Sequence, residues 1–337
     1  MSHLKAGQID DAVREIHEVL HLDPQHAEAH YQLGCYYGAH DQWEYAFREI
    51  EIAVQCDPDN VEFRSTLAGS YENHGRIEEA IREYQTVIRI TPDDSKIHFV
   101  LAILYGRQNR IKDAIYHLGE SARLGHKLAQ EFLAMVKELK KNESIGQSAT
   151  DEAVLHYARG GYCEIKGRMT DAAQEYQRAI QLRNDIPEAH FKLGMIYFNR
   201  DRIDDCIHEF EEALRIRPDY DDAHVELGTA YGKKGLSEKE ITHYLAAPNN
   251  ASAHCRLGII YGQQRRANDE IYEYKKAIEL DPKLISAHHN FGVTLMEQGR
   301  YEEAWYEFKA VLKLDPNDED ARKGYQTALR KWRSSTK

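Results

Sequence analysis

Apolar residues recur at helical spacing along most of this chain, and the recurrence comes in pairs of segments. In residues 285–318, Phe291 and Leu295 lie one helical turn apart, and a turn is expected at Gly299. After that turn the apolar residues again recur at helical spacing, at Ala304, Phe308, Val311 and Leu312. Pro316 marks the end of the second segment, because the residue before a proline avoids the helical region. The segment is therefore predicted to form two amphipathic helices.

The same unit recurs eight times. Its first helix carries phrases such as EAHYQLGCYYG (28–38), EAHFKLGMIYF (188–198) and SAHCRLGIIYG (252–262). The spacing between successive starts is 34 residues, except across one gap and once at 30. Positions are counted below from the first residue of each unit, at 27, 61, 95, 153, 187, 221, 251 and 285. Because one helix pair cannot bury its apolar face alone, neighbouring units are expected to stack.

The repeated order of a large residue, Leu-Gly, Tyr, then Ala, an aromatic residue and Pro resembles the tetratricopeptide repeat (TPR) family. The resemblance covers about 270 of the 337 residues. It implies an all-α fold, an α-solenoid in which stacked helix-turn-helix units wind into a right-handed superhelix. It also implies a protein that binds other proteins.

Irregularities in the repeat predict the domain organisation. Residues 1–26 supply only a half repeat, which acts as an N-terminal cap or remains from a unit cut short. The remaining predicted segments are three units at 27–128, a degenerate helix and hinge loop at 129–152, five units at 153–318 (with 221–250 shortened), and a C-terminal capping helix at 319–337.

Composition narrows the function. The net charge of −12 argues against nucleic acid as a partner, since a phosphate-backbone binder needs a basic stripe. No apolar run approaches the roughly 20 residues that span a bilayer, and the N-terminus lacks the apolar stretch of a signal peptide. Five cysteines are too few for a disulfide scaffold, so a cytoplasmic location is expected.

Three clusters of chemically active residue types are better explained by packing. Seven units carry His at position four, but each His lies on a different helix, and packed helix axes lie ~8–10 Å apart, too far for a shared metal ion. The motif HEVLH at 17–21 matches a zinc-protease pattern but has no third ligand. His254 and Cys255 are adjacent on a helix and point about 100° apart. We therefore expect no enzyme activity, no metal and no cofactor.

A stripe beside the core-facing positions is the candidate binding site. In TPR proteins this stripe lines a concave, peptide-binding groove, and here it is rich in apolar and aromatic residues. The alternative is that these side chains pack on neighbouring first helices. The candidate groove residues are Tyr31, Cys35, Phe99, Ile103, Arg107, Tyr157, Phe191, Met195, Asn199, Val225, Arg256, Ile259 and His289.

The leading hypothesis is a scaffold or adaptor that holds a peptide or helix of a partner protein in this groove. One alternative is self-assembly into homo-oligomers through the face that the incomplete first unit exposes. Another is a regulator in which the 129–152 hinge lets two arrays close on a peptide. The sequence does not identify the partner.

Overall fold

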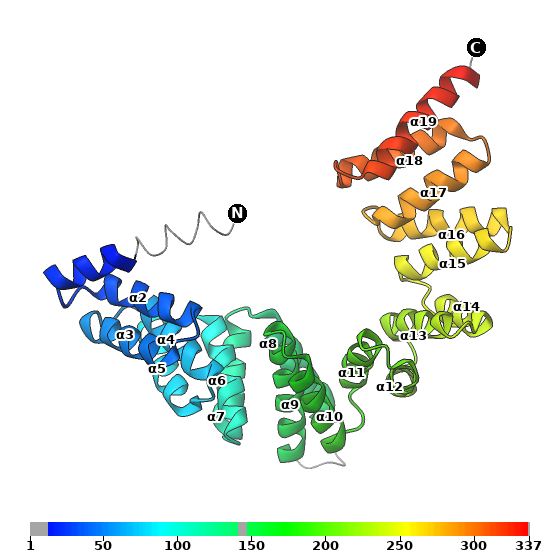
Figure 1. The fold of residues 1–337 in the computed structure, drawn as a ribbon. Coiled ribbons are helices and arrows are strands. Elements are labelled where there is room, and N and C mark those ends of the chain that lie inside the picture. The colour runs from blue at the N-terminus through cyan, green and yellow to red at the C-terminus, as the bar shows by residue number, and fades with distance from the viewer. Residues whose placement is uncertain (1–12, 141–146, 336–337) are drawn as a thin grey trace. The chain divides into compact units, whose positions relative to one another are not determined.

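The computed structural model describes residues 13–140 and 147–335, and within these residues the regular elements are α-helices without a strand (Figure 1). The chain forms two compact units, Met1–Arg183 and Asn184–Lys337. After the helical residues 13–22, the first unit holds α2 (Ala27–Ala39), α3 (Trp43–Cys56), α4 (Val61–Asn73), α5 (Ile77–Ile90), α6 (Ser95–Arg107), α7 (Ile111–Arg123), α8 (Lys127–Lys140), α9 (Gln147–Ile165) and α10 (Met169–Leu182).

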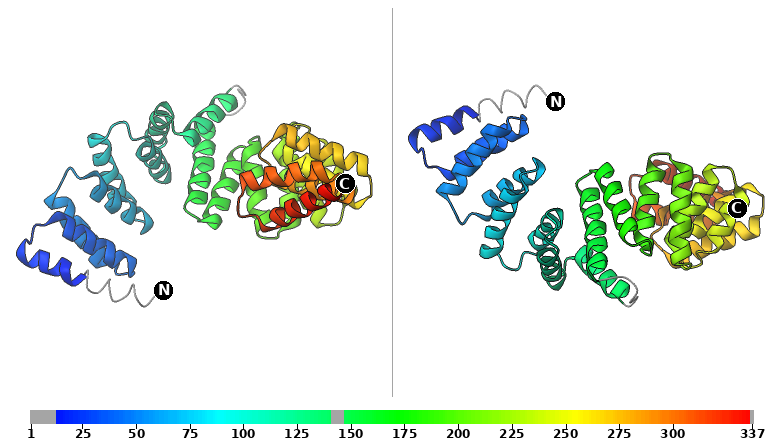
Figure 2. Two further views of the ribbon diagram at one scale, coloured as in Figure 1. Left: turned by 90° about the horizontal axis from the view of Figure 1, so that it is seen from above. Right: turned by 90° about the horizontal axis from the view of Figure 1, so that it is seen from below.

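The second compact unit continues the same alternation of first and second helices. It holds α11 (Pro187–Asn199), α12 (Ile203–Ile216), α13 (Asp221–Lys233), α14 (Ser237–Leu245), α15 (Ala251–Gln263), α16 (Ala267–Leu280), α17 (Ile285–Glu297), α18 (Tyr301–Leu314) and α19 (Glu319–Ser335). Each first helix packs closely on the second helix of its own repeat, and Figure 2 shows these pairs following one another in chain order in the first compact unit. The expected all-α fold of stacked helix pairs is confirmed.

Glycine at position eight allows the two helices of a repeat to approach closely. A Cβ on Gly194 would lie 2.6 Å from Cε1 of Phe210, and a Cβ on Gly258 would lie 2.6 Å from Cε1 of Tyr274. Both rings are buried, so they have little room to move aside. In these two repeats the glycine of the Leu-Gly pair is therefore required by packing between the helices.

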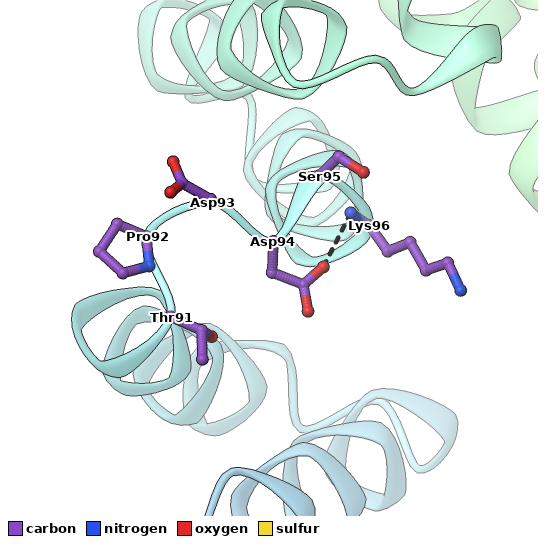
Figure 3. A pocket seen from close by; sticks show the side chains of 6 residues that line it. All are labelled: Thr91, Pro92, Asp93, Asp94, Ser95 and Lys96. Carbon is purple, nitrogen blue, oxygen red and sulfur yellow. Dashed lines mark hydrogen bonds between the residues drawn. The ribbon is translucent and has the colours of Figure 1, made fainter.

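The turns of the repeat use side-chain capping and left-handed backbone. In the turn Thr91–Lys96 between α5 and α6, Asp94 accepts hydrogen bonds from the backbone N–H groups of Lys96 (2.9 Å) and Ile97 (3.1 Å), which caps the new helix (Figure 3). The turn inside each repeat needs a positive φ, as at Gly75 (75°) and Asn109 (57°). Capping residues such as Asp94 and turn residues such as Gly75 therefore mark the ends of the helices in the sequence.

The segment expected as a degenerate helix and hinge loop lies within the first compact unit. Helix α9 begins at Gln147, inside the stretch expected to be a loop, and residues 141–146 lie outside the described part of the chain. The ring of Phe132 in α8 lies 5.9 Å from that of Phe99 in α6 and 5.4 Å from that of Tyr157 in α9. Helix α8 therefore lies between the elements that precede and follow it, and aromatic packing holds it there.

Helices α14 and α19 depart from the regular repeat in the second compact unit. Helix α14 has nine residues, whereas α12 and α16 each have fourteen. At the C-terminal end, α19 covers α18, and the ring of Trp305 lies 5.4 Å from that of Tyr325 and 5.8 Å from that of Trp332. None of the helices that the structure describes combines the length and the apolar character needed to span a membrane.

Candidate functional site

Histidine at position four is a hydrogen-bonding bridge between helices. His254 lies with Nδ1 2.5 Å from Oε2 of Glu273 in the second helix and with Nε2 3.1 Å from the carbonyl oxygen of Pro248 in the preceding turn. His288 repeats the arrangement with Glu307 (2.6 Å) and Pro282 (3.1 Å). The ring thus joins its own second helix to the turn before its repeat, which is a structural task.

Each histidine at position four pairs with the residue nineteen positions later in the sequence, a pairing that the repeat pattern did not predict. The Nδ1 atoms pair as His30–Glu49, His98–His117, His156–Glu175, His190–Glu209, His224–His243, His254–Glu273 and His288–Glu307. The constant spacing of 19 between His and Glu was the available signal. Among the described residues, no group of three or more His, Cys, Asp or Glu side chains is placed to hold a metal ion.

The two kinds of pair set the protonation of the histidines differently. Both ring nitrogens of His254 and of His288 face acceptors, so the pKa values of these two histidines are raised, chiefly by the hydrogen bond to glutamate. In the His–His pairs, burial and the neighbouring imidazole lower the pKa of His117 and of His243 to about 4.

Position five, expected to line the groove, is largely an interface between neighbouring helices. Phe99, Tyr157 and Val225 are buried. Phe99 stacks on His126 (4.5 Å), and Tyr157 packs on Phe132. Tyr31, half-buried, is hydrogen-bonded to Thr66 of the next first helix (3.1 Å). This placement differs from the expectation for Phe99, Tyr157 and Val225: they are packed against other helices and are not available to a ligand.

The half-buried position-five residues of the second compact unit also contact other helices. The ring of Phe191 lies 5.7 Å from that of Phe210 in α12, and the ring of His289 lies 5.9 Å from that of Phe308 in α18. Each keeps part of its surface exposed, so each can border a binding surface without forming its centre.

Position nine divides into buried and exposed members. Ile103 is 1% exposed, which removes it from a ligand-binding surface, contrary to expectation. Ile259 and Val293, on α15 and α17, are each 40% exposed. Cys35 is exposed and Met195 half-buried. The exposed large apolar side chains at position nine therefore belong to the last two regular repeats.

The polar candidates lie at the edge of this surface or away from it. Arg256 is exposed beside Ile259, and Asn199 is exposed at the end of α11. Burial raises the pKa of Glu226, and the charge of Arg256 opposes that shift. Arg107 is exposed at the end of α6, in the first compact unit. We name Arg256, Ile259, His289 and Val293 the inner strip.

Comparison with family models identifies the repeat. A model described as "TPR repeat" matches residues 71–109 and 165–201, and models described as "Tetratricopeptide repeat" match residues 1–61, 187–220, 251–284 and 273–306. Together the matches cover more than half of the chain. The chain belongs to the TPR family. Proteins built of TPR units typically serve as scaffolds for protein–protein interaction, and the matching models are all repeat models.

Solved structures with a similar TPR fold have low sequence identity to this chain. The C-terminal part of a TPR repeat-containing protein from Cytophaga hutchinsonii is 17% identical, with 79% of this chain and 99% of that chain covered and a TM-score of 0.44. MamA from Desulfovibrio magneticus RS-1 is 21% identical, covering 50% of this chain and 97% of that chain, with a TM-score of 0.42. Yeast Tom70 is 14% identical, with coverage of 92% and 89% and a TM-score of 0.37. A search of curated proteins gave no match.

Proposed function

We propose that this TPR protein is a non-enzymatic scaffold that binds a peptide or helix of a partner protein on the inner strip. The observation that carries the proposal is the pair Ile259 and Val293, which stand at the same repeat position on neighbouring first helices and are each 40% exposed. Apolar side chains that share a position on neighbouring helices offer two anchors to one extended or helical ligand.

The surroundings of the two anchors support a peptide ligand. Arg256 is exposed next to Ile259, and half-buried His289 lies four residues before Val293. An apolar centre with charged or polar neighbours is typical of protein interfaces, in which a few central residues dominate the binding energy. The buried positions Phe99, Ile103, Tyr157 and Val225 are left out of this surface, since exposing them would unpack the repeats.

The test is a double substitution, Ile259→Asp and Val293→Asp, in the full chain. Both side chains are 40% exposed, so the helices should still form, and circular dichroism checks that they do. The matched control is Tyr272→Asp with Tyr306→Asp, which changes two exposed aromatic residues on the second helices of the same repeats (58% and 54% exposed). Partners recovered from an extract of the native cells are quantified by mass spectrometry.

We expect the strip variant to recover its principal partner at least tenfold less than the wild type, and the control to recover it normally. Equal recovery with the strip variant and with the wild type would contradict the proposal. Loss in both variants would contradict the proposal that binding depends specifically on the inner strip.

A further inference from the structure

A small polar cavity in the first compact unit is lined by three arginines. It has a volume of about 200 Å³ and lies between the α6–α7 turn and helices α9 and α10. Arg107 reaches it from the end of α6, Arg159 from α9 and Arg178 from α10. Guanidinium groups repel one another, so three of them around one cavity indicate a place where an anion is stabilised.

Arg159 departs from the repeat pattern. It stands at position seven, where six of the other units carry Leu and one carries Phe. Its side chain is only 15% exposed, and it donates to Oε1 of Glu175 over 2.6 Å. The other oxygen of Glu175 lies 2.7 Å from Nδ1 of His156, which also lines the cavity. A buried cation has thus replaced a core leucine and is held in place by a carboxylate behind it.

The other two arginines are not neutralised. Arg107 and Arg178 are exposed, and within the described residues neither has an ion-pair or hydrogen-bond partner. Burial, with a smaller contribution from the charges of Arg107 and Arg178, lowers the pKa of Arg159 against the opposing effect of Glu175. Glu152 is the one carboxylate among the described lining residues, so the three guanidinium groups leave the lining with an excess of positive charge.

The size of the cavity restricts the ligand to a small group. A volume of about 200 Å³ holds several times the ~30 Å³ share of one water molecule but is below the ~300–1,000 Å³ of pockets that enclose whole small molecules. The anionic group therefore enters while the rest of its ligand stays outside. A phosphate monoester carries ≈ −1.5 to −2 charge and three acceptor oxygens, which use more guanidinium donors than the two oxygens of a carboxylate.

We propose that the cavity formed by Arg107, Arg159 and Arg178 binds the phosphate monoester of a phosphorylated peptide segment. Arg107 from α6 and Arg178 from α10 contact the phosphate oxygens, and Arg159, held by Glu175, supplies the least exposed of the three guanidinium groups. This site lies in Met1–Arg183 and the inner strip lies in Asn184–Lys337, so each is tested without the other.

The test uses the full chain and three short peptides of one sequence that carry phosphoserine, glutamate or serine at the centre, with inorganic phosphate as a fourth probe. Isothermal titration calorimetry measures affinity at fixed ionic strength, since arginine–phosphate binding weakens with salt. The test variant is Arg107→Glu with Arg178→Glu, and the matched control is Arg48→Glu with Arg82→Glu, which makes the same charge change at exposed positions of α3 and α5.

We expect the phosphoserine peptide to bind the wild type and the control equally, and the test variant at least tenfold more weakly. Inorganic phosphate should compete with it, and the glutamate and serine peptides should bind at least tenfold more weakly. A second variant, Arg159→Leu, restores the leucine of the repeat and should lose the binding while remaining folded. The proposal is overturned if the wild type binds neither phosphate nor the phosphoserine peptide. Equal weakening in test variant and control, or equal binding of the phosphoserine and glutamate peptides, would also overturn it.

Discussion

The helix pair α6–α7 and the helix pair α15–α16 have the same repeat design but different surroundings. Position nine is isoleucine in both, and Ile103 is 1% exposed whereas Ile259 is 40% exposed. The reason lies outside the unit: α6 packs against α9 as well as α7, and the rings of α8 and α9 surround Phe99. A repeat position therefore determines which face of the helix a residue occupies, whereas neighbouring helices determine whether that face is covered.

The largest expected difference concerns these two isoleucines. Ile103→Ala should destabilise its region by about 3–4 kcal/mol, since it removes buried methyl groups and leaves a cavity. Ile259→Ala should cost less than about 1 kcal/mol, because much of its side chain is already exposed to water. Hydrogen–deuterium exchange of peptides from α6 and α15 measures each region separately, which suits a repeat array whose unfolding need not be two-state. Similar losses in both regions would refute the difference in packing.

The second difference concerns tyrosine hydroxyls that bond to glutamate. Tyr162 donates to the carboxylate of Glu72 (2.8 Å to each oxygen), and Glu72 is 1% exposed. Tyr231 donates to Glu211 (2.5 Å), which is exposed. Tyr162→Phe should cost about 2–3 kcal/mol, because it leaves a buried carboxylate without this donor, whereas Tyr231→Phe should cost about 0.5–1 kcal/mol.

A double variant separates the effect of losing the Tyr162 hydroxyl from the effect of leaving the Glu72 carboxylate charged. Adding Glu72→Gln to Tyr162→Phe removes the charge, so part of the lost stability should return, and hydrogen exchange of α9 peptides from the four chains gives the coupling. Additive losses would show that the hydrogen bond does not stabilise the carboxylate.

The smallest expected difference is in the response to pH. The pKa of His117 is about 4 in the fold against 6.5 for the free side chain, so the unfolded chain takes up a proton first as the pH falls. The α6–α7 region should therefore lose stability between pH 6.5 and 4, by about 1 kcal/mol at pH 5, because solvent screens this partly exposed ring. The raised pKa of His288 acts in the opposite sense: its stabilisation is present below pH 6.5 and is lost as the pH rises through the raised value.

The variant His117→Glu tests this sign, because it converts the pair with His98 into the His–Glu pair of the other repeats. Hydrogen exchange of α6 peptides, compared between wild type and variant at pH 7 and pH 5, should show a loss on acidification in the wild type alone. An equal response of both chains would mean that His117 is not the responsible group.

Part of the candidate site could be derived from the sequence. The spacing of repeats identified the first helices, and it placed Arg256, Ile259 and His289 on the correct helices and positions. It did not show that Phe99 and Tyr157 are covered, because their partners His126 and Phe132 come from the irregular segment. Arg159 was marked in the sequence by its departure from leucine at position seven, but its neighbours in the cavity come from α6 and α10.

The helix pairs, the turns and the family could be predicted from the sequence, because they depend on apolar periodicity, proline and glycine within about one repeat length. The exposure of the groove positions, the hydrogen bond between Tyr162 and Glu72, and the meeting of Arg107, Arg159 and Arg178 at one cavity became visible in the folded chain. These features depend on how α8 and α9 pack on earlier helices. Such packing is a non-local contact that no periodic pattern within a single repeat encodes.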